Sequence, residues 1–220
     1  GLMADELVIN NDNHIINIKG EKFTVTNNFN NNANTGVTLN LGESGKTQIV
    51  DAVFDDKTFV NITEGAVEFT KNPGIKKLNL NSPSEITVEF KADGVGAIEY
   101  TTPAEVLNTV VYSNNTIFDK ASVDQNLQFR STGVNTLATI TTENLAKADF
   151  ITDATDTGRI VIGDAGTTTG TLSIGNIGVS NSKFKSVEIK SNASITGNTY
   201  ATNITIADSK TAEFGGVVSG

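Results

Sequence analysis

The last third of the chain repeats one short pattern, in the phrases Gly158-Arg-Ile-Val-Ile-Gly163, Gly170-Thr-Leu-Ser-Ile-Gly175, Ser186-Val-Glu-Ile-Lys190 and Asn203-Ile-Thr-Ile-Ala207. Each phrase sets apolar residues at alternate positions between small or polar residues. Because successive side chains of a strand point to opposite faces, each phrase predicts a strand with one buried face. The phrases return at a loose interval of roughly 10 to 17 residues, which favours a parallel β-solenoid, a fold in which the chain coils and each turn stacks on the last.

The same alternation continues through the rest of the chain. It occurs at Ile16/Ile18, Phe23/Val25, Val37/Leu39/Leu41, Leu78/Leu80, Ile86/Val88/Phe90, Leu127/Phe129, Ile160/Ile162, Leu172/Ile174, Val187/Ile189, Ile204/Ile206 and Ala212/Phe214. Turn-forming residues such as Asn72-Pro73-Gly74 and Gly197-Asn198 separate these segments. We therefore expect an all-β fold, a single right-handed parallel β-helix over residues 1–220, with any sub-boundary near residues 100–150. A β-sandwich is the alternative, because alternation alone does not distinguish paired hairpins from stacked turns.

One or two short helical excursions are expected between the strands. Thr102-Pro103-Ala104-Glu105 places Thr at the N-cap, Pro at the first helical position and Glu at the third, so side chains can satisfy the free amides of a helix start. Residues 143–149, Glu-Asn-Leu-Ala-Lys-Ala-Asp, follow Thr142 and contain good helix formers. Either segment is expected to be a side excursion or a cap of the coil.

Composition excludes several classes of function. The 220 residues carry 16 Lys and Arg against 25 Asp and Glu, a net charge of -9, and the basic residues are scattered. Such a surface repels phosphate backbones, so no nucleic-acid partner is expected. The absence of cysteine excludes disulfides and cysteine-based metal or redox sites. No segment is apolar enough for a membrane-spanning helix, and residues 1–6 lack the features of a signal peptide, so any export signal is expected outside these residues.

Two groups of carboxylates are the strongest candidates for chemistry. They are Asp51, Asp55 and Asp56, and then Asp149, Asp153, Asp156 and Asp164. Paired carboxylates cleave glycosidic bonds, and clustered ones bind calcium. Neither group has the spacing of a calcium-binding loop, and acids in loops ordinarily keep a protein soluble. We therefore assign no metal ligand and no catalytic residue to either group.

Two further motifs lack essential parts. His14 is the only imidazole, and no Gly-x-Ser-x-Gly sequence accompanies it, so no Ser-His-Asp triad is expected. Gly42-Glu-Ser-Gly-Lys-Thr47 ends like a phosphate-binding loop but lacks its first glycine, and a predicted strand follows where that loop needs a helix. The few aromatic residues, mostly Phe within strand patterns, are expected in the core. The chain is therefore expected to be no enzyme and to hold no cofactor.

The end of the chain resembles a known family. Residues 199–220, TYATNITIADSKTAEFGGVVSG, contain an apolar-x-apolar strand, a polar turn and a Thr-Ala-x-Phe-Gly-Gly phrase. This stretch resembles the repeated turns of type V autotransporter passenger domains. With Asn135-Thr-Leu-Ala-Thr-Ile140 and Gly175-Asn-Ile-Gly178, the Asn-, Thr- and Ile-rich texture is similar in particular to the large rickettsial surface antigens, outer-membrane proteins A and B. The phrases match over residues 155–220, and the N-terminal half matches only in texture.

The resemblance implies a passenger on the bacterial cell surface, exterior to the outer membrane or secreted, and anchored only through a barrel domain absent from this chain. Its expected function is adhesion to host cells or service as a surface antigen, with a host surface protein or glycan as partner. A structural spacer or surface-layer module is the first alternative. A polysaccharide-acting β-helix enzyme is the second, and it requires acids gathered in one groove.

The phrase at residues 203–207 offers a specific test of side-chain direction. We expect Ile204 and Ile206 to point into the coil and Thr205 to point to solvent, because strand side chains alternate. On this basis Ile206→Asp is expected to cost several kcal/mol, and Thr205→Asp less than about 1 kcal/mol.

Overall fold

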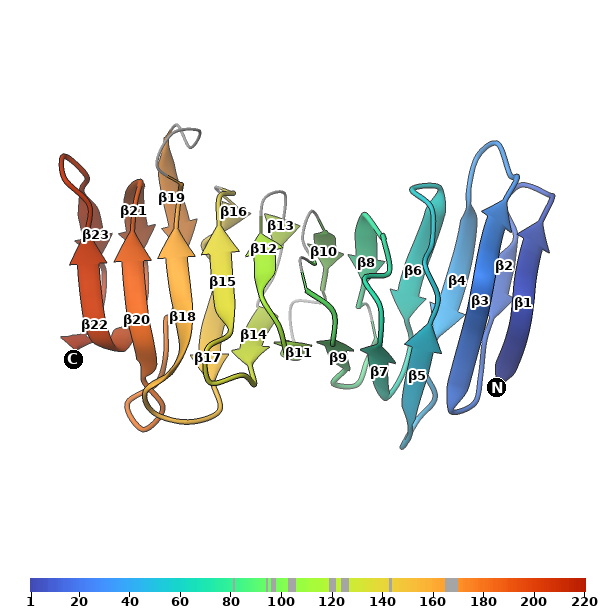
Figure 1. Cartoon of the computed structure of the whole chain (residues 1–220), viewed down its shortest axis with the longest axis horizontal. Helices are drawn as coiled ribbons and strands as arrows, with labels where there is room; N and C mark the ends of the chain where they lie inside the picture. Colours follow the sequence, from blue (N-terminus) through green and yellow to red (C-terminus); the bar gives the residue numbers. More distant parts are fainter. Residues whose placement is uncertain are drawn as a thin grey trace.

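The chain forms an elongated coil of stacked β-strands (Figure 1). The computed structural model describes residues 1–80, 82–93, 95, 98–102, 106–118, 122–123, 127–142, 144–164 and 170–220. All secondary-structure elements in these residues are β-strands. The paired strands run parallel and form a β-solenoid of about nine turns. The expected all-β solenoid is therefore confirmed, and the β-sandwich alternative is wrong.

The strands form four sheets, in which neighbours come from successive turns of the coil. The eight-stranded sheet contains β1 (Leu2–Ile9), β3 (Lys22–Asn31), β5 (Thr47–Asp51), β7 (Ala66–Phe69), β9 (Thr87–Phe90), β11 (Asn108–Tyr112), β14 (Leu127–Ser131) and β17 (Ala148–Thr152). The first six-stranded sheet contains β13 (Ser122–Val123), β10 (Glu99–Thr101), β8 (Lys77–Asn79), β6 (Thr58–Ile62), β4 (Val37–Leu41) and β2 (Ile15–Asn17). The second contains β12 (Thr116–Phe118), β15 (Leu137–Ile140), β18 (Thr157–Ile162), β20 (Phe184–Ile189), β22 (Thr199–Ile206) and β24 (Val218–Ser219). The four-stranded sheet contains β16 (Asn144–Leu145), β19 (Thr171–Ile174), β21 (Asn192–Ile195) and β23 (Ala212–Phe214).

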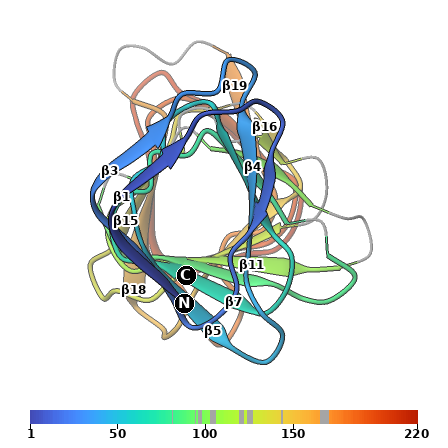
Figure 2. The same ribbon diagram turned by 90° about the vertical axis from the view of Figure 1, so that its right-hand side faces the viewer.

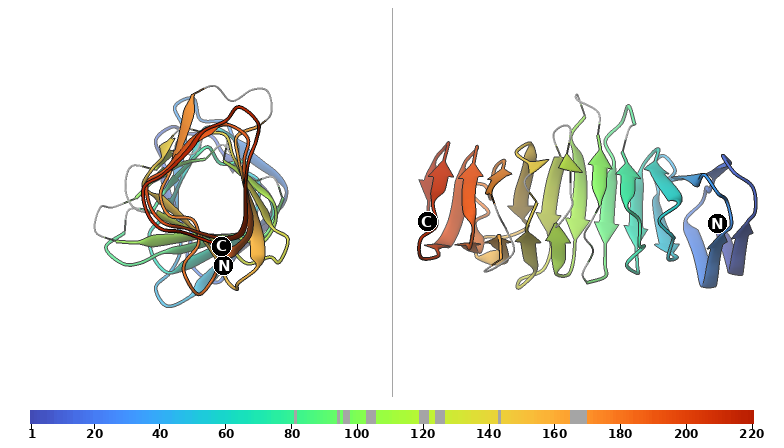
Figure 3. Two further views of the ribbon diagram at one scale, coloured as in Figure 1. Left: turned by 90° about the vertical axis from the view of Figure 1, so that its left-hand side faces the viewer. Right: turned by 90° about the horizontal axis from the view of Figure 1, so that it is seen from above.

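The sheets wrap around one central axis. Viewed from either end, the successive turns superpose as a ring (Figures 2 and 3). Through the middle of the chain, β11 pairs with β14 and β14 pairs with β17, so one sheet crosses residues 108–152 without a break in its pairing. The side chains inside the ring form the core.

The length of a turn differs from the interval between the sequence phrases. Strand register pairs Ile160 with Val187, and Val187 with Ile204, so the first of these turns is much longer than the second. The phrases at residues 158–163 and 170–175 lie in β18 and β19, which belong to different sheets. The interval of roughly 10 to 17 residues therefore combined spacings between strands of the same turn with spacings between successive turns. As a repeat length it was wrong.

The core is built by the alternation that the sequence predicts. In β14 and β17 the residues alternate between buried and half-buried positions, as the two faces of a strand require. Parallel register places Phe90 over Phe69 and Phe150 over Phe129, and both ring pairs are stacked, with centroids 5.3 Å and 5.1 Å apart. Such aromatic pairs contribute packing energy beyond the burial of their area.

The expected helix at residues 143–149 is wrong over the residues described. Asn144 and Leu145 form β16, Ala146 and Lys147 form a turn, and β17 starts at Ala148. A helix this short is not stable by its own propensity. Pairing with strands of adjacent turns satisfies this backbone and buries Leu145 and Ala148 completely. The other expected helix, over residues 102–105, lies outside the described part of the chain except for Thr102.

In the last turn, side chains that point into the coil are not deeply buried. Ile204 and Ile206 lie in register with Val187 and Ile189, which are fully buried, and Thr205 lies in register with the outward Glu188. Ile206 is nevertheless 46% exposed, because no further strand covers it in these residues. The predicted direction agrees with this register, but the deep burial expected of Ile206 is wrong.

Candidate functional site

Three of the carboxylates singled out in the sequence contact neighbouring side chains. Asp51 forms an ion pair with Lys71 at 2.7 Å, and Asp153 forms one with Arg130 at 3.5 Å. The Asp55 carboxylate accepts a hydrogen bond of 2.7 Å from the Thr58 hydroxyl at the start of β6. Among the described residues, no three His, Asp or Glu side chains are grouped closely enough to hold a metal ion.

The two incomplete motifs also have structural positions. His14 is exposed just before β2, and its carbonyl accepts a hydrogen bond from the Thr38 amide at 2.9 Å. Lys46, in the Gly42–Thr47 turn, forms an ion pair with Glu43 at 2.8 Å. This hydrogen bond raises the pKa of Lys46 and lowers the pKa of Glu43. The lysine that a phosphate-binding loop would offer to its ligand is therefore held by a neighbouring carboxylate.

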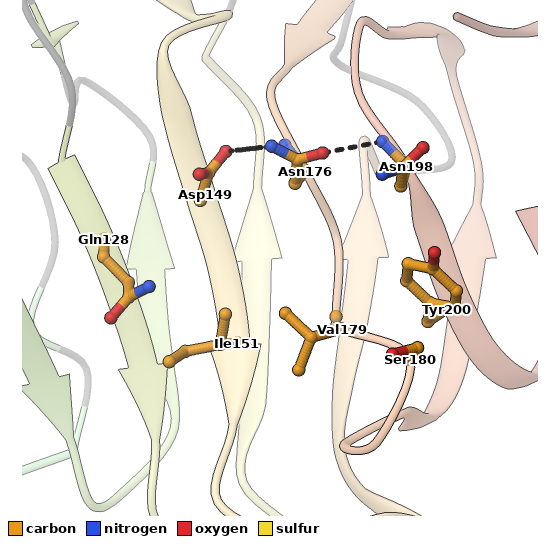
Figure 4. A pocket seen from close by; sticks show the side chains of 9 residues that line it. Gln128, Asp149, Ile151, Asn176, Val179, Ser180, Asn198 and Tyr200 are labelled. Atoms are coloured by element: carbon orange, nitrogen blue, oxygen red, sulfur yellow. Dashed lines mark hydrogen bonds between the residues drawn. The ribbon is translucent and has the colours of Figure 1, made fainter. Parts of the chain in front are cut away.

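A shallow groove on the outer surface, near the C-terminal end of the coil, is the best candidate for a binding site (Figure 4). Its volume is about 340 Å³. The lining residues are Gln128 from β14, Asp149 and Ile151 from β17, Asn176, Gly178, Val179 and Ser180 from the segment after β19, and Asn198 and Tyr200 around the start of β22. The groove therefore crosses successive turns and runs along the coil.

One side of the groove is a row of polar side chains (Figure 4). Asp149 Oδ1 accepts hydrogen bonds from the backbone amide and the side-chain Nδ2 of Asn176, at 2.8 Å and 2.9 Å. Asn176 Oδ1 accepts one from the backbone amide of Asn198 at 2.7 Å, and Asn198 Oδ1 accepts one from the Val217 amide at 2.8 Å. We call Asp149, Asn176 and Asn198 the polar ladder. Each step fixes one side chain against the backbone of the next turn.

Glycine makes this ladder possible. A Cβ atom at Gly197 would lie 2.2 Å from Asn176 Oδ1, and one at Gly175 would lie 2.4 Å from the Ala148 carbonyl oxygen. The Gly-Asn pairs at 175–176 and 197–198 are therefore the local sequence that brings the ladder side chains against the neighbouring turn. Their recurrence one turn apart is a signal from which the ladder could have been predicted.

The floor of the groove is apolar and contains a gap. Phe150, Ile177 and Thr199 pair across three turns and are fully buried, so the residues after them face outward. Those residues are Ile151, Gly178 and Tyr200. Gly178 has a φ of 72° and no side chain, and a Cβ atom there would lie 2.4 Å from the Tyr200 carbonyl oxygen. The groove lies between the side chains of Ile151 and Tyr200, with Val179 beside them, and Gly178 contributes no side chain to it (Figure 4).

Several polar groups of the groove are available to a ligand. Within the described residues, no hydrogen bond uses the Gln128 amide, Asp149 Oδ2, Asn198 Nδ2 or the Tyr200 hydroxyl. Among the described residues that line the groove, Asp149 is the only one with an ionisable carboxylate or amine. The groove can therefore accept and donate hydrogen bonds, but it offers no positive charge.

The groove was missed in the sequence, because the aromatic residues were expected in the core. Tyr200 lies between Thr199 and Ala201, which are both fully buried, so it is an aromatic residue in the outward phase of its strand. The alternating pattern of this strand in the sequence already indicated that Tyr200 points outward.

Comparisons with known proteins add no named relative. Within the described residues, no helix is long and apolar enough to cross a membrane. Comparison of the chain with protein-family models, with curated proteins and with solved structures finds no match.

Proposed function

We propose that this chain is a passenger segment of an autotransporter-like protein on the bacterial cell surface, and that it acts in adhesion to host cells or as a surface antigen. It is not an enzyme in this proposal. The observation that carries the proposal is the elongated parallel solenoid of about nine turns, whose sheets extend along the whole coil (Figure 1). A fold of this kind provides an extended surface for recognition.

Recognition by such a surface depends on many weak contacts. The pocket of about 340 Å³ is open and shallow, and it crosses several turns. The net charge of -9 keeps the coil soluble and repels polyanions. Affinity is then spread over area, as in other extended interfaces. The partner in this proposal is a protein or glycan on the host cell.

The alternative of a polysaccharide-acting enzyme requires paired acids in a groove. Asp149 is the only acid among the described residues that line the groove, and Asp153 is ion-paired with Arg130. The alternative of a structural spacer requires only the coiled fold and no particular site.

The test uses beads coated with the purified chain and a panel of cultured animal cells. Adhesion is expected to be saturable and to be competed by the soluble chain, and beads coated with heat-unfolded chain serve as the control. If the beads bind to none of the cell types, the spacer is favoured. Release of new sugar ends from polysaccharides, lost in Asp153→Asn or Asp156→Asn, would favour the enzyme.

A further inference from the structure

We propose that the groove of the polar ladder and Tyr200 binds an uncharged glycan, with a sugar ring lying over Ile151, Gly178 and Tyr200. The inference rests on the proposed function, because it names the kind of host molecule that the surface recognises.

The groove and a sugar ring each have an apolar part and a polar part, and the two arrangements match. A pyranose ring has faces of C–H groups and a rim of hydroxyls. The groove has an apolar floor of Ile151, Val179 and the Tyr200 ring, and a polar row along one side (Figure 4). A ring placed on this floor would contact its apolar face and direct its rim hydroxyls to the ladder. Binding sites for small ligands ordinarily combine apolar lining with a few placed polar groups in this way.

The hydrogen-bonding groups of the groove also suit a sugar. Asp149 Oδ2 accepts, Asn198 Nδ2 donates, and the Gln128 amide and the Tyr200 hydroxyl do both. Sugar hydroxyls also donate and accept, so neighbouring hydroxyls can be paired with this set. The ladder bonds of 2.7–2.9 Å already hold Asp149, Asn176 and Asn198 in place. For these three residues, little side-chain entropy remains to be lost when a ligand binds.

The charge of the groove favours a neutral ligand. An anionic ligand would meet the Asp149 carboxylate, and no cation is found among the described lining residues. Arg130, which is in register with Ile151, is paired with the Asp153 carboxylate at 3.5 Å. The chain as a whole has a net charge of -9. These charges disfavour sulfated and sialylated glycans and favour neutral ones.

The length of the groove fits a short piece of glycan. The outward residues Ile151, Gly178 and Tyr200 follow residues paired on three successive turns. Strands of a sheet lie about 4.8 Å apart, so the floor extends for roughly 10 Å along the coil. This length accommodates one or two sugar rings and leaves the rest of a linear glycan on the outer surface.

The experiment uses the tyrosine side chains as reporters. The chain has three tyrosines, and Tyr100 and Tyr112 are 2% and 0% exposed, so Tyr200 is the one that a ligand in the groove can contact. Protein labelled on its tyrosine rings is titrated with lactose, maltotriose and chitotriose and observed by NMR. A saturable shift of the Tyr200 signal is expected with at least one sugar, at millimolar concentrations, without a shift of the other two.

Variants separate the groove from the rest of the surface. Tyr200→Ala is expected to weaken binding at least tenfold, and Tyr200→Phe only a few-fold, because the ring remains. Gln128→Ala is expected to weaken binding several-fold. Phe59→Ala removes an aromatic side chain that is 41% exposed on β6 and is the matched control, with no expected effect on binding. Circular dichroism confirms that each variant is folded, and binding to the alanine variants is followed by calorimetry.

Three outcomes would overturn the inference: no shift with any sugar, equal binding by Tyr200→Ala, or tighter binding of sialyllactose than of lactose. The bead assay distinguishes these from failure of the proposed function. If the sugars bind but coated beads adhere to no cell, the groove stands as a glycan site and the adhesion proposal fails. If beads adhere equally with wild type and Tyr200→Ala, adhesion stands and the groove is not its contact surface.

Discussion

The turn that contains β20 and the last turn, which contains β22, have the same apolar alternation but differ in how deeply it is buried. Val187 and Ile189 of β20 are completely buried, with β18 on one side and β22 on the other. In β22, Ile204 is half-buried and Ile206 is 46% exposed. The alternation sets the direction of each side chain, and the two adjacent turns set its burial. In a solenoid, each turn therefore depends on its neighbours for most of its core.

The largest expected effect is that of Ile189→Asp in the inner turn. An unpaired carboxylate at this fully buried position is expected to cost more than about 4 kcal/mol or to prevent folding. Ile189→Val, which only shortens the side chain, is expected to cost about 1 kcal/mol. Urea denaturation of the two variants measures the difference. A loss for Ile189→Asp no greater than that for Ile206→Asp would mean that the inner turn is no better covered than the last.

The second prediction concerns high pH and a tyrosine of the inner turns. Burial raises the pKa of Tyr100, whose ring also packs against Phe129 at 5.4 Å. Because its pKa is higher in the folded than in the unfolded chain, folding loses stability as pH rises above about 10, where the unfolded tyrosine ionises. The free energy of unfolding, measured by urea from pH 8 to pH 11, is expected to fall at the upper end. The fall is expected to be shallower in Tyr100→Phe, and identical slopes would contradict the assignment.

The third prediction concerns a second row of amides, on the outer face of the sheet that contains β2, β4 and β6. Asn40 donates to Asn17 Oδ1 at 2.8 Å and accepts from Asn61 at 3.0 Å, so it is bonded to both neighbouring turns. Each such bond contributes about 0.5–1.5 kcal/mol. Asn40→Ala is therefore expected to cost about 1–2 kcal/mol, and Asn17→Ala, at the end of the row, about half as much. Equal losses would show that the amides do not act as a continuous row.

The smallest effects are expected in the last turn. The carboxylate of Ile206→Asp remains hydrated, so the loss is that of a partly buried isoleucine, about 1 kcal/mol. Thr205→Asn is a better outward control than Thr205→Asp, because position 205 lies opposite Glu188 and a second carboxylate there would be repelled. Thr205→Asn is expected to change stability by less than about 0.5 kcal/mol. A cost of several kcal/mol for Ile206→Asp in chemical denaturation would show that this position is buried in solution.

The sequence contained enough to predict the class of fold, because alternation is a local property. Pairs such as Phe129 and Phe150 lie inside the coil as their phase requires. The length of a turn could not be read directly, because the turn from Ile160 to Val187 is much longer than the turn from Val187 to Ile204. The expected helix near Leu145 failed because pairing between turns overrides weak helix propensity.

The groove was harder to predict than the fold, because it depends on alignment between turns. The outward phase of Tyr200 can be read from its buried neighbours Thr199 and Ala201. That Ile151, Gly178 and Tyr200 line up requires the register, which loops of unequal length conceal. The recurring Gly-Asn pairs at 175–176 and 197–198 are the local signal that comes closest to giving it.

The direction of the backbone hydrogen bonds also has a mechanical consequence. They join one turn to the next, so they run along the long axis of the coil while the strands lie across it (Figure 1). A pulling force along this axis therefore loads the bonds of the terminal turn first, in the opening direction and not in shear. Single-molecule stretching is expected to show low, successive rupture events, each releasing one turn. A turn such as that from Phe69 to Phe90 lengthens to roughly 70 Å when extended. Such a coil yields gradually under tension and can re-form turn by turn when the load is removed.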